Sequence, residues 1–291
     1  MEFASVEGEH AYARVVQAAP RTVVGLDFDG TLSPIVEDPR EARIHADAGG
    51  VLVELAAEVA AIAVITGRPA RQALDLGGLE EVGDAMLAAG TELYLFGQYG
   101  NERWSSSQRR IVSPRPPRGL ATFERELPRT LRLAGAQDAF VEDKGLAVAV
   151  HTRRLPDPEA AFERLLPELK ELARRHGLTV EPGRAVIEVR SSGSHKGLVV
   201  ERLAAELDAG GFVFAGDDLG DVEAFEAVAD LQRQGLATLR VCSASSEQSA
   251  LTAMADVVVS GPEGVVAFLR TLAADARAAR GGGGGSGGSG L

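Results

Sequence analysis

Residues 22–35 read TVVGLDFDGTLSPI, and this stretch decides the fold. The run TVVGL (22–26) predicts a short buried strand, and the Asp-Phe-Asp-Gly directly after it predicts the turn that ends the strand. The chain then alternates, with a helix expected over 47–60, a strand over 61–66 and a helix over 69–76. This alternation predicts a parallel sheet, because parallel strands need a crossover connection, usually a helix.

The same alternation returns after residue 195 and runs almost to the end of the chain. We expect strands over 212–216, 237–244 and 255–260, and helices over 196–209, 218–230 and 261–279. The two stretches together predict a doubly wound, Rossmann-like α/β core. The last residues, 281–291, read GGGGGSGGSGL and predict a flexible tail, because glycine and serine pack poorly.

The middle of the chain has a different pattern. After the turn cluster SPRPPRG (113–119) we expect a helix over 120–134, two strands within 140–152, a helix over 157–176 and two more short strands. Paired strands with adjoining helices predict an α+β unit with an antiparallel sheet. The expected organisation is a smaller cap domain, 113–189, inserted between two parts of the core, 1–112 and 190–280.

The charge balance argues against polyanionic partners. With 42 acidic and 30 basic residues the net charge is -12, which repels nucleic acid and anionic lipid. A phosphorylated substrate would therefore need a few placed cations and a metal ion. No apolar stretch reaches the roughly 18 residues of a membrane span. Cys242 is the one cysteine, which fits a reducing compartment and predicts a cytoplasmic protein, while nothing indicates an oligomeric state.

Asp27 and Asp29 follow the first strand, at the sheet edge where ligands bind. Two close carboxylates repel each other unless a cation lies between them, and Mg2+ prefers such ligands together with substrate phosphate. A carboxylate can also attack phosphorus and form an acyl phosphate that water then hydrolyses. Asp27 is the candidate nucleophile and Asp29 the candidate acid and base. The alternative is that Asp-Phe-Asp-Gly is an ordinary turn.

The second strand ends in a similar motif, AVITGRP (63–69). Thr66 and the N–H groups after it can bind phosphate oxygens where the next helix begins. Arg68 can reach the phosphate or a sugar. The alternative for Thr66 is a helix cap, with Pro69 at the first helical turn, and one side chain can serve both purposes.

Lysine is rare in this chain, since three of its 30 basic residues are lysines. Lys196 opens a predicted helix where the chain returns to the core, and an ammonium group suits both a phosphate and a neighbouring carboxylate. We interpret Lys196, and to a lesser extent Lys144, as functional. Lys170, in the middle of a predicted helix, is interpreted as a solvated surface residue.

A further acidic motif, GDDLGDVEAF (216–225), begins at the end of a strand. Asp217 can complete a metal site there. Asp218 and Asp221 can orient its waters or Lys196. The alternative for Asp221 is a favourable position in the first turn of a helix, which does not explain Asp217.

These four motifs, in this order, resemble the haloacid dehalogenase superfamily of phosphohydrolases. LDFDGTLSPIVEDP (26–39), VEDKGLAVAVHTRR (141–154) and IEVR followed by KG (187–197) look like signature stretches of the trehalose-6-phosphate phosphatase family. The resemblance implies trehalose 6-phosphate as substrate and Asp27 as nucleophile, with Lys196 at the phosphate. It also implies Mg2+ held by three residues, Asp27, the backbone of Asp29, and Asp217.

In the inserted unit, the resemblance implies sugar binding by five polar residues, Glu142, Lys144, His151, Arg153 and Glu188. The alternatives are a turn position for Lys144, a solvent-facing position for Glu188 and a strand-end position for His151. Five sites depart from the family pattern: Gly220 for Thr, Val222 for Glu, Thr152 for Tyr, Ser191 for Pro, and GQYG (97–100) for Gly-Ser-His-Gly. Two other functions stay open: a phosphatase of the superfamily acting on another sugar phosphate, and a catalytically silent phosphosugar-binding protein.

Overall fold

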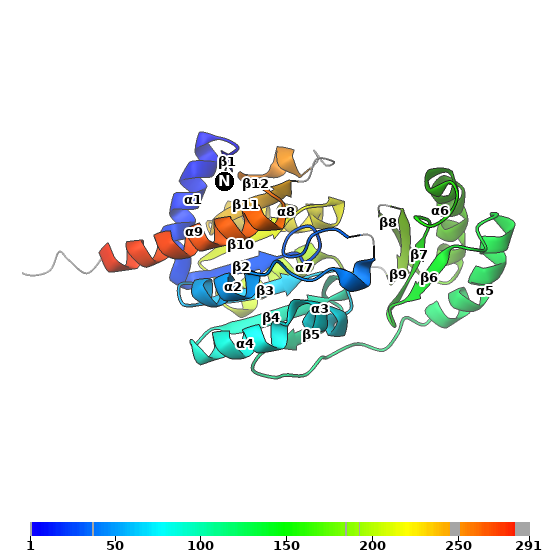
Figure 1. Ribbon diagram of the computed structural model, residues 1–291, viewed down its shortest axis with the longest axis horizontal. Helices are drawn as coiled ribbons and strands as arrows, with labels where there is room; N and C mark the ends of the chain where they lie inside the picture. The colour runs from blue at the N-terminus through cyan, green and yellow to red at the C-terminus, as the bar shows by residue number, and fades with distance from the viewer. Residues whose placement is uncertain (1, 37, 184, 192, 245–250, 283–291) are drawn as a thin grey trace, which may run out of the picture. The chain divides into compact units, whose positions relative to one another are not determined.

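The computed structural model describes residues 2–36, 38–183, 185–191, 193–244 and 251–282. The chain divides into two compact units (Figure 1). The first combines Met1–Val112 with His195–Leu291, and the second is Ser113–Ser194. The second unit is thus an insertion in the sequence of the first.

The first unit contains an eight-stranded sheet of order β1-β12-β11-β10-β2-β3-β4-β5. The strands between the two edges run parallel, and the edge strands β1 and β5 are antiparallel to their neighbours. The strands are β1 (Glu2–Phe3), β2 (Thr22–Leu26), β3 (Ala61–Ile65), β4 (Glu92–Gly97), β5 (Glu102–Ser105), β10 (Gly211–Gly216), β11 (Ala237–Ala244) and β12 (Val257–Ser260). All residues of β2 and β3 are buried, as expected for central parallel strands covered on both faces.

Helices cover both faces of this sheet. Apolar residues of α1, α2, α3, α4 and α9 form one core cluster, and those of α7 and α8 form another on the opposite face. The helices are α1 (Val6–Ala18), α2 (Ala48–Ala56), α3 (Ala70–Gly77), α4 (Leu79–Ala88), α7 (Lys196–Glu206), α8 (Val222–Arg233) and α9 (Gly261–Gly282). The predicted α/β class with a parallel-sheet core is confirmed.

Several details differ from the sequence-based expectation. Residues 2–21, for which no element was predicted, contain β1 and α1. The helix expected over 47–60 is shorter, because α2 ends at Ala56 and a turn precedes β3. Residues 77–112, for which no element was predicted, contain α4, β4 and β5. Helix α9 continues through Gly282, so the expected tail does not begin at residue 281, and residues 283–291 lie outside the described part of the chain.

The second unit has an antiparallel sheet of order β6-β7-β9-β8. Its elements are α5 (Leu120–Leu133), β6 (Phe140–Asp143), β7 (Ala147–His151), α6 (Pro158–Arg175), β8 (Thr179–Gly183) and β9 (Val186–Arg190). Apolar residues of α5 and α6 pack with Val148, Val150, Ile187 and Val189 on one face of the sheet. The expected boundary after residue 189 falls inside β9, because that strand runs to Arg190.

Candidate active site

Three predicted site residues follow directly on three neighbouring parallel strands. Strand β2 lies between β10 and β3, and the three strands end at Leu26, Gly216 and Ile65. Asp27, Asp217 and Thr66 are therefore brought to the same carboxyl edge of the sheet, where ligands bind in open α/β folds. All three are buried.

Lys196 connects two of the acidic residues. It is the first residue of α7, and its Nζ donates hydrogen bonds to Oδ1 of Asp27 at 2.5 Å and to Oδ1 of Asp221 at 2.7 Å. Burial alone would lower the pKa of Lys196, but the charges of Asp221 and Asp27 outweigh it and raise that pKa well above its usual value. The group is therefore a permanent cation beside the Asp27 carboxylate.

Asp221 uses both of its carboxylate oxygens within the protein. Oδ1 accepts from Lys196, and Oδ2 accepts from the backbone N–H of Asp217 at 3.0 Å. The side chain thus orients the lysine and the strand end that carries Asp217. Asp218 is placed differently, since its Oδ1 accepts from the backbone N–H of Gly220 at 2.9 Å and caps the turn.

The acidic cluster has the chemistry of a divalent cation site. One carboxylate oxygen from each of Asp27, Asp217 and Asp221 lies within 4.8 Å of the others, and all three residues are buried. Burial, followed by the charge of Asp27, raises the pKa of Asp217 to about 9. Burial also raises the pKa of Asp27, with Lys196 opposing the change. Carboxylates that are costly to ionise without a cation fit Mg2+, and Asp27 and Asp217 keep oxygens for it.

Arg68 binds Asp29 rather than standing free for a substrate. Its Nε and Nη2 donate to the two carboxylate oxygens of Asp29 at 2.7 and 2.5 Å, and its Nη1 donates to the carbonyl of Pro39 at 2.7 Å. The guanidinium also lies over the ring of Phe28, 5.4 Å from its centroid. Because the guanidinium binds both carboxylate oxygens at once, it fixes the orientation of the Asp29 carboxylate.

Thr66 does not cap helix α3, contrary to one of its expected roles. Its Oγ1 accepts from the backbone N–H of Arg68 at 3.1 Å, within the turn before the helix. The N-terminus of α3 is satisfied instead by Glu102, whose Oε2 accepts from the N–H of Ala70 at 2.6 Å. Glu102 was not predicted as a site residue, and no local sequence signal links it to a helix 32 positions earlier.

The turn after Asp29 requires glycine for two reasons. Gly30 has a φ of 72°, and a Cβ at this position would lie 2.0 Å from Oδ2 of Asp217. A side chain there would strain the backbone and displace the Asp217 carboxylate. Ser243 of β11 holds the same turn, because its Oγ donates to the carbonyl of Gly30 at 2.6 Å. Its position near a strand end was the signal that could have identified it.

The candidate sugar-binding residues belong to the second unit. Glu142, Ala149 and Glu188 are cross-strand neighbours in register, so their side chains share one face of the sheet, opposite to Val148 and Val189. This face is therefore the one that α5 and α6 leave uncovered within the unit.

Two close pairs lie among these residues. Nζ of Lys144 lies 2.6 Å from Oε2 of Glu188, and Nε2 of His151 lies 2.9 Å from Oε2 of Glu142. Glu188 is buried, so it does not occupy the solvent-facing position considered for it. Arg153 is exposed in the turn after β7.

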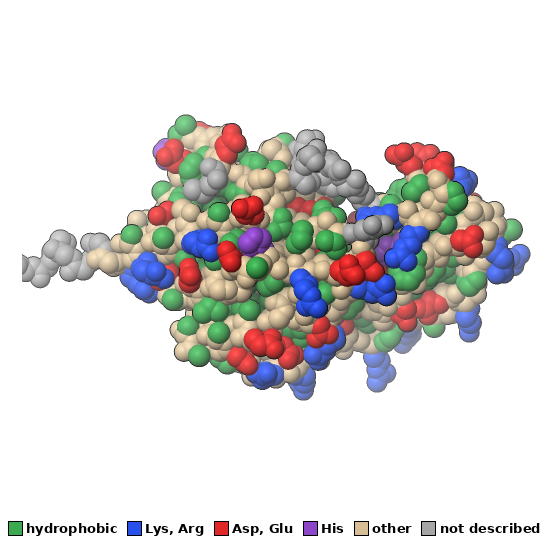
Figure 2. All heavy atoms as spheres, in the orientation of Figure 1, with side chains coloured by type: hydrophobic (Ala, Val, Ile, Leu, Met, Phe, Trp, Pro, Cys, Tyr) green, Lys and Arg blue, Asp and Glu red, His purple; other side chains and the backbone are tan. Residues whose placement is uncertain are grey.

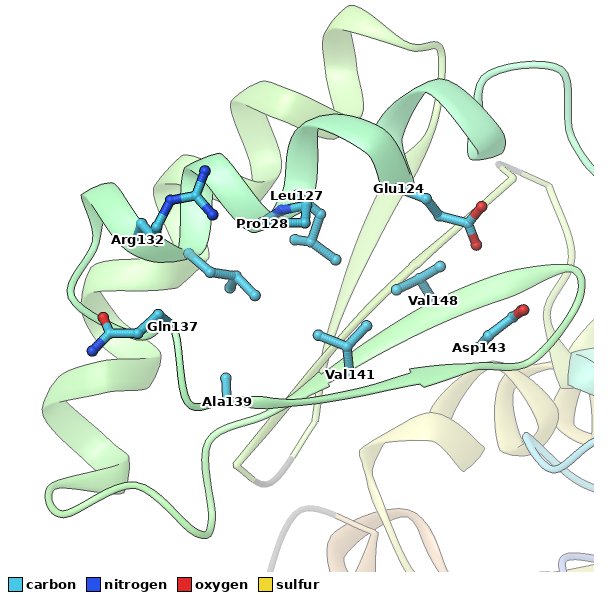
Figure 3. A pocket seen from close by; sticks show the side chains of 10 residues that line it. Glu124, Leu127, Pro128, Arg132, Gln137, Ala139, Val141, Asp143 and Val148 are labelled. Carbon is cyan, nitrogen blue, oxygen red and sulfur yellow. The ribbon is translucent and has the colours of Figure 1, made fainter.

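A cavity of about 420 Å³ lies on the other side of this sheet (Figure 3). Leu127 and Pro128 of α5 face Val141 and Val148 across it, with Glu124 and other polar side chains at its ends. Because Val148 belongs to the face packed on the helices, this cavity is separate from the Glu142 and Glu188 face. Asp27, Asp29 and Asp217 do not line it.

On the face drawn in Figure 2, acidic and basic side chains are interspersed. Among the described helices, none is both long and apolar enough to cross a lipid bilayer.

Comparison with known proteins gives consistent matches. A family model described as Trehalose-phosphatase matches residues 25–104 and 126–258. An uncharacterized glycosyl hydrolase of Mycobacterium tuberculosis is 35% identical over 217 residues, covering 72% of this chain and 15% of that protein. Trehalose-phosphate phosphatase of Mycobacterium marinum is 30% identical over 222 residues, covering 72% of this chain and 52% of that protein. The chain thus spans about half or less of the length of these relatives.

A solved structure supports the fold. The C-terminal domain of Candida albicans trehalose-6-phosphate phosphatase superposes with a TM-score of 0.73, at 20% identity, covering 94% of this chain and 98% of that chain. The family match includes the strand ends that carry Asp27, Thr66 and Asp217. On these grounds the chain belongs to the trehalose-phosphatase family.

Proposed function

We propose that this protein is a cytoplasmic, Mg2+-dependent phosphatase that hydrolyses trehalose 6-phosphate through an aspartyl-phosphate on Asp27. The observation that carries the proposal is the pairing of a buried Asp27 with Lys196 at 2.5 Å, on the sheet edge that also presents Asp217 and Thr66. A lysine beside the nucleophile offsets the repulsion between a carboxylate and an approaching phosphate.

The residues divide the reaction among them. A carboxylate oxygen of Asp27 attacks phosphorus as the bond from phosphorus to the sugar oxygen breaks, and Asp29 gives its proton to that oxygen. Asp29 then takes a proton from water, which attacks the aspartyl-phosphate and releases inorganic phosphate. Arg68 keeps the Asp29 carboxylate oriented for both transfers. The hydroxyl of Thr66 is available to the phosphate from the neighbouring strand end.

Mg2+ would be held by Asp27, Asp217 and the backbone carbonyl of Asp29, and would neutralise phosphate charge. Asp221 positions Lys196 rather than the ion, because both of its oxygens are already bound. Asp218 stabilises the turn that carries Asp217.

Substrate choice is assigned to the second unit acting as a cap. We infer that Glu142, Lys144 and Glu188 bind sugar hydroxyls, and that His151 and Arg153 add contacts at the edge of the same sheet. Charged groups bind hydroxyls through charge-assisted hydrogen bonds, and these require a sugar to be present. The core residues recognise phosphate alone and cannot distinguish one phosphate ester from another.

Phosphate release from a panel of sugar phosphates tests the proposal. We expect trehalose 6-phosphate to give the highest kcat/KM, above sucrose 6-phosphate and glucose 6-phosphate. A higher kcat/KM for another sugar phosphate would identify that ester, instead of trehalose 6-phosphate, as the substrate. Absence of phosphate release from every ester, with intact binding of trehalose 6-phosphate, would identify a silent phosphosugar-binding protein instead.

A further inference from the structure

The turn after β4 has an unusual backbone. Gln98, Tyr99 and Gly100 have φ values of 48°, 59° and 97°, so three successive residues lie in the left-handed region. Only the last of them is a glycine, and non-glycine residues persist in this region only where the surrounding structure imposes it. Such residues are concentrated at functional sites.

Two of these residues, Gln98 and Tyr99, bind the turn after β3, residues 66–68. The N–H of Gln98 donates to the carbonyl of Arg68 at 2.8 Å, and the N–H of Tyr99 donates to the carbonyl of Thr66 at 3.0 Å. These two bonds bracket Gly67. An ordinary extended or helical backbone would direct the two N–H groups elsewhere, so the left-handed conformation is what joins the two turns.

The side chain of Tyr99 also contacts the turn after β3. A Cβ on Gly67 would lie 2.8 Å from both Cζ and Oη of Tyr99, so the end of the phenol ring rests against the Gly67 backbone. The turn itself is held in place at both ends. A Cβ on Gly97 would lie 2.5 Å from the backbone nitrogen of Ala70, and one on Gly100 would lie 2.4 Å from Cγ2 of Val199.

We propose that Tyr99 is a positioning residue for the Thr66–Gly67–Arg68 turn. Its ring and backbone fix Thr66, which is proposed to bind phosphate, and Arg68, which holds both carboxylate oxygens of Asp29. The proposal assigns the positioning to the aromatic ring. Because Oη lies as close to Gly67 as Cζ does, Tyr99→Phe tests the hydroxyl separately. The proposal rests on the proposed phosphatase function and adds a residue that touches neither the phosphorus nor the metal site.

Three variants test it. Tyr99→Asn removes the ring but keeps a residue that tolerates left-handed backbone, and Tyr99→Phe keeps the ring. Asp208→Asn is the matched control, because Asp208 also has a positive φ, 46°, but lies at the exposed end of α7. We expect Tyr99→Asn to lower kcat about 100-fold, the scale of a misplaced catalytic group. The loss should be equal for trehalose 6-phosphate and p-nitrophenyl phosphate, since the turn serves the reacting centre. Tyr99→Phe and Asp208→Asn should retain the wild-type kcat.

Two results would overturn the proposal: a wild-type kcat in Tyr99→Asn, or an equal loss in Tyr99→Phe, which would assign the effect to the hydroxyl. Circular dichroism and the unfolding midpoint establish that each variant is folded. If the wild-type protein hydrolyses no phosphate ester, the proposed function fails. The positioning role is then judged by calorimetric affinity for inorganic phosphate, which Tyr99→Asn should weaken and Tyr99→Phe should not.

Discussion

Nε and Nη2 of Arg68 donate hydrogen bonds to both carboxylate oxygens of Asp29. The arginine side chain is 9% exposed, whereas the aspartate side chain is 41% exposed. Asp29, the proposed acid and base, is thus accessible to substrate but cannot rotate freely. This arrangement suits a group that must give a proton to one oxygen and later take a proton from another at nearly the same place.

The first prediction follows from that pair. Arg68→Lys keeps the positive charge but loses the fork, so Asp29 should lose its orientation and kcat should fall about 10- to 100-fold. Steady-state kinetics with p-nitrophenyl phosphate measures it. Arg71→Lys is the control, because Arg71 is an exposed residue of α3 that pairs with Glu80 of α4. A normal kcat in Arg68→Lys would show that a single charge suffices.

The second prediction concerns the two aspartates of the first motif. Asp27→Asn should abolish turnover and labelling of the protein by phosphate, since the nucleophile is lost while its volume is kept. Asp29→Asn should retain slow turnover, reduced by about 10²- to 10⁴-fold. Mass spectrometry of trapped intermediate, together with phosphate release, distinguishes the two roles. Retained labelling of Asp27→Asn would place the nucleophile elsewhere.

The third prediction concerns the cation and pH. Burial raises the pKa of Asp217 to about 9 from a usual value of 3.8, so without a cation the folded protein binds this proton more tightly than the unfolded chain does. Metal-free stability should therefore fall as pH rises from about 4 towards 9. Mg2+ competes with that proton, so it should raise the unfolding midpoint more at pH 8 than at pH 5. Asp217→Asn should reduce this pH-dependent gain. An equal gain at both pH values would contradict the assignment.

The same site predicts a metal requirement for activity. Chelation should abolish phosphate release, and Ca2+ should restore it poorly, because it takes more ligands at longer distances and misplaces the reacting groups. Phosphate release in excess chelator is the measurement. Full activity there would refute a metal-dependent mechanism.

The last prediction separates the two units. Lys144→Ala or Glu188→Ala should lower kcat/KM for trehalose 6-phosphate yet leave hydrolysis of p-nitrophenyl phosphate nearly unchanged, because an aryl phosphate has no sugar hydroxyls to lose. Lys170→Ala is the matched control, an exposed lysine on the opposite, helical side of the same unit. A parallel loss with both substrates would assign the pair a structural role.

Much of the core site could be predicted because the carboxyl ends of parallel strands lie at one edge of the sheet. Asp27, Thr66 and Asp217 each follow an apolar run, and parallel strands bring such residues to one edge whatever the intervening sequence. The hydrogen bonds from Arg68 to Asp29 could not be predicted, because they join side chains 39 positions apart. Ser243 could have been singled out by its position near a strand end, but its bond to Gly30, 213 positions away, follows from the strand order.

The insertion leaves the first unit after Val112, and the chain returns to that unit at His195. Every residue assigned to phosphate chemistry lies outside it, and every residue assigned to the sugar lies inside it. On the proposed assignments the protein is modular: the insertion could be exchanged for another while the residues proposed to break the ester are kept. Chimeras that graft foreign inserts between these two residues would carry one reaction to new substrates.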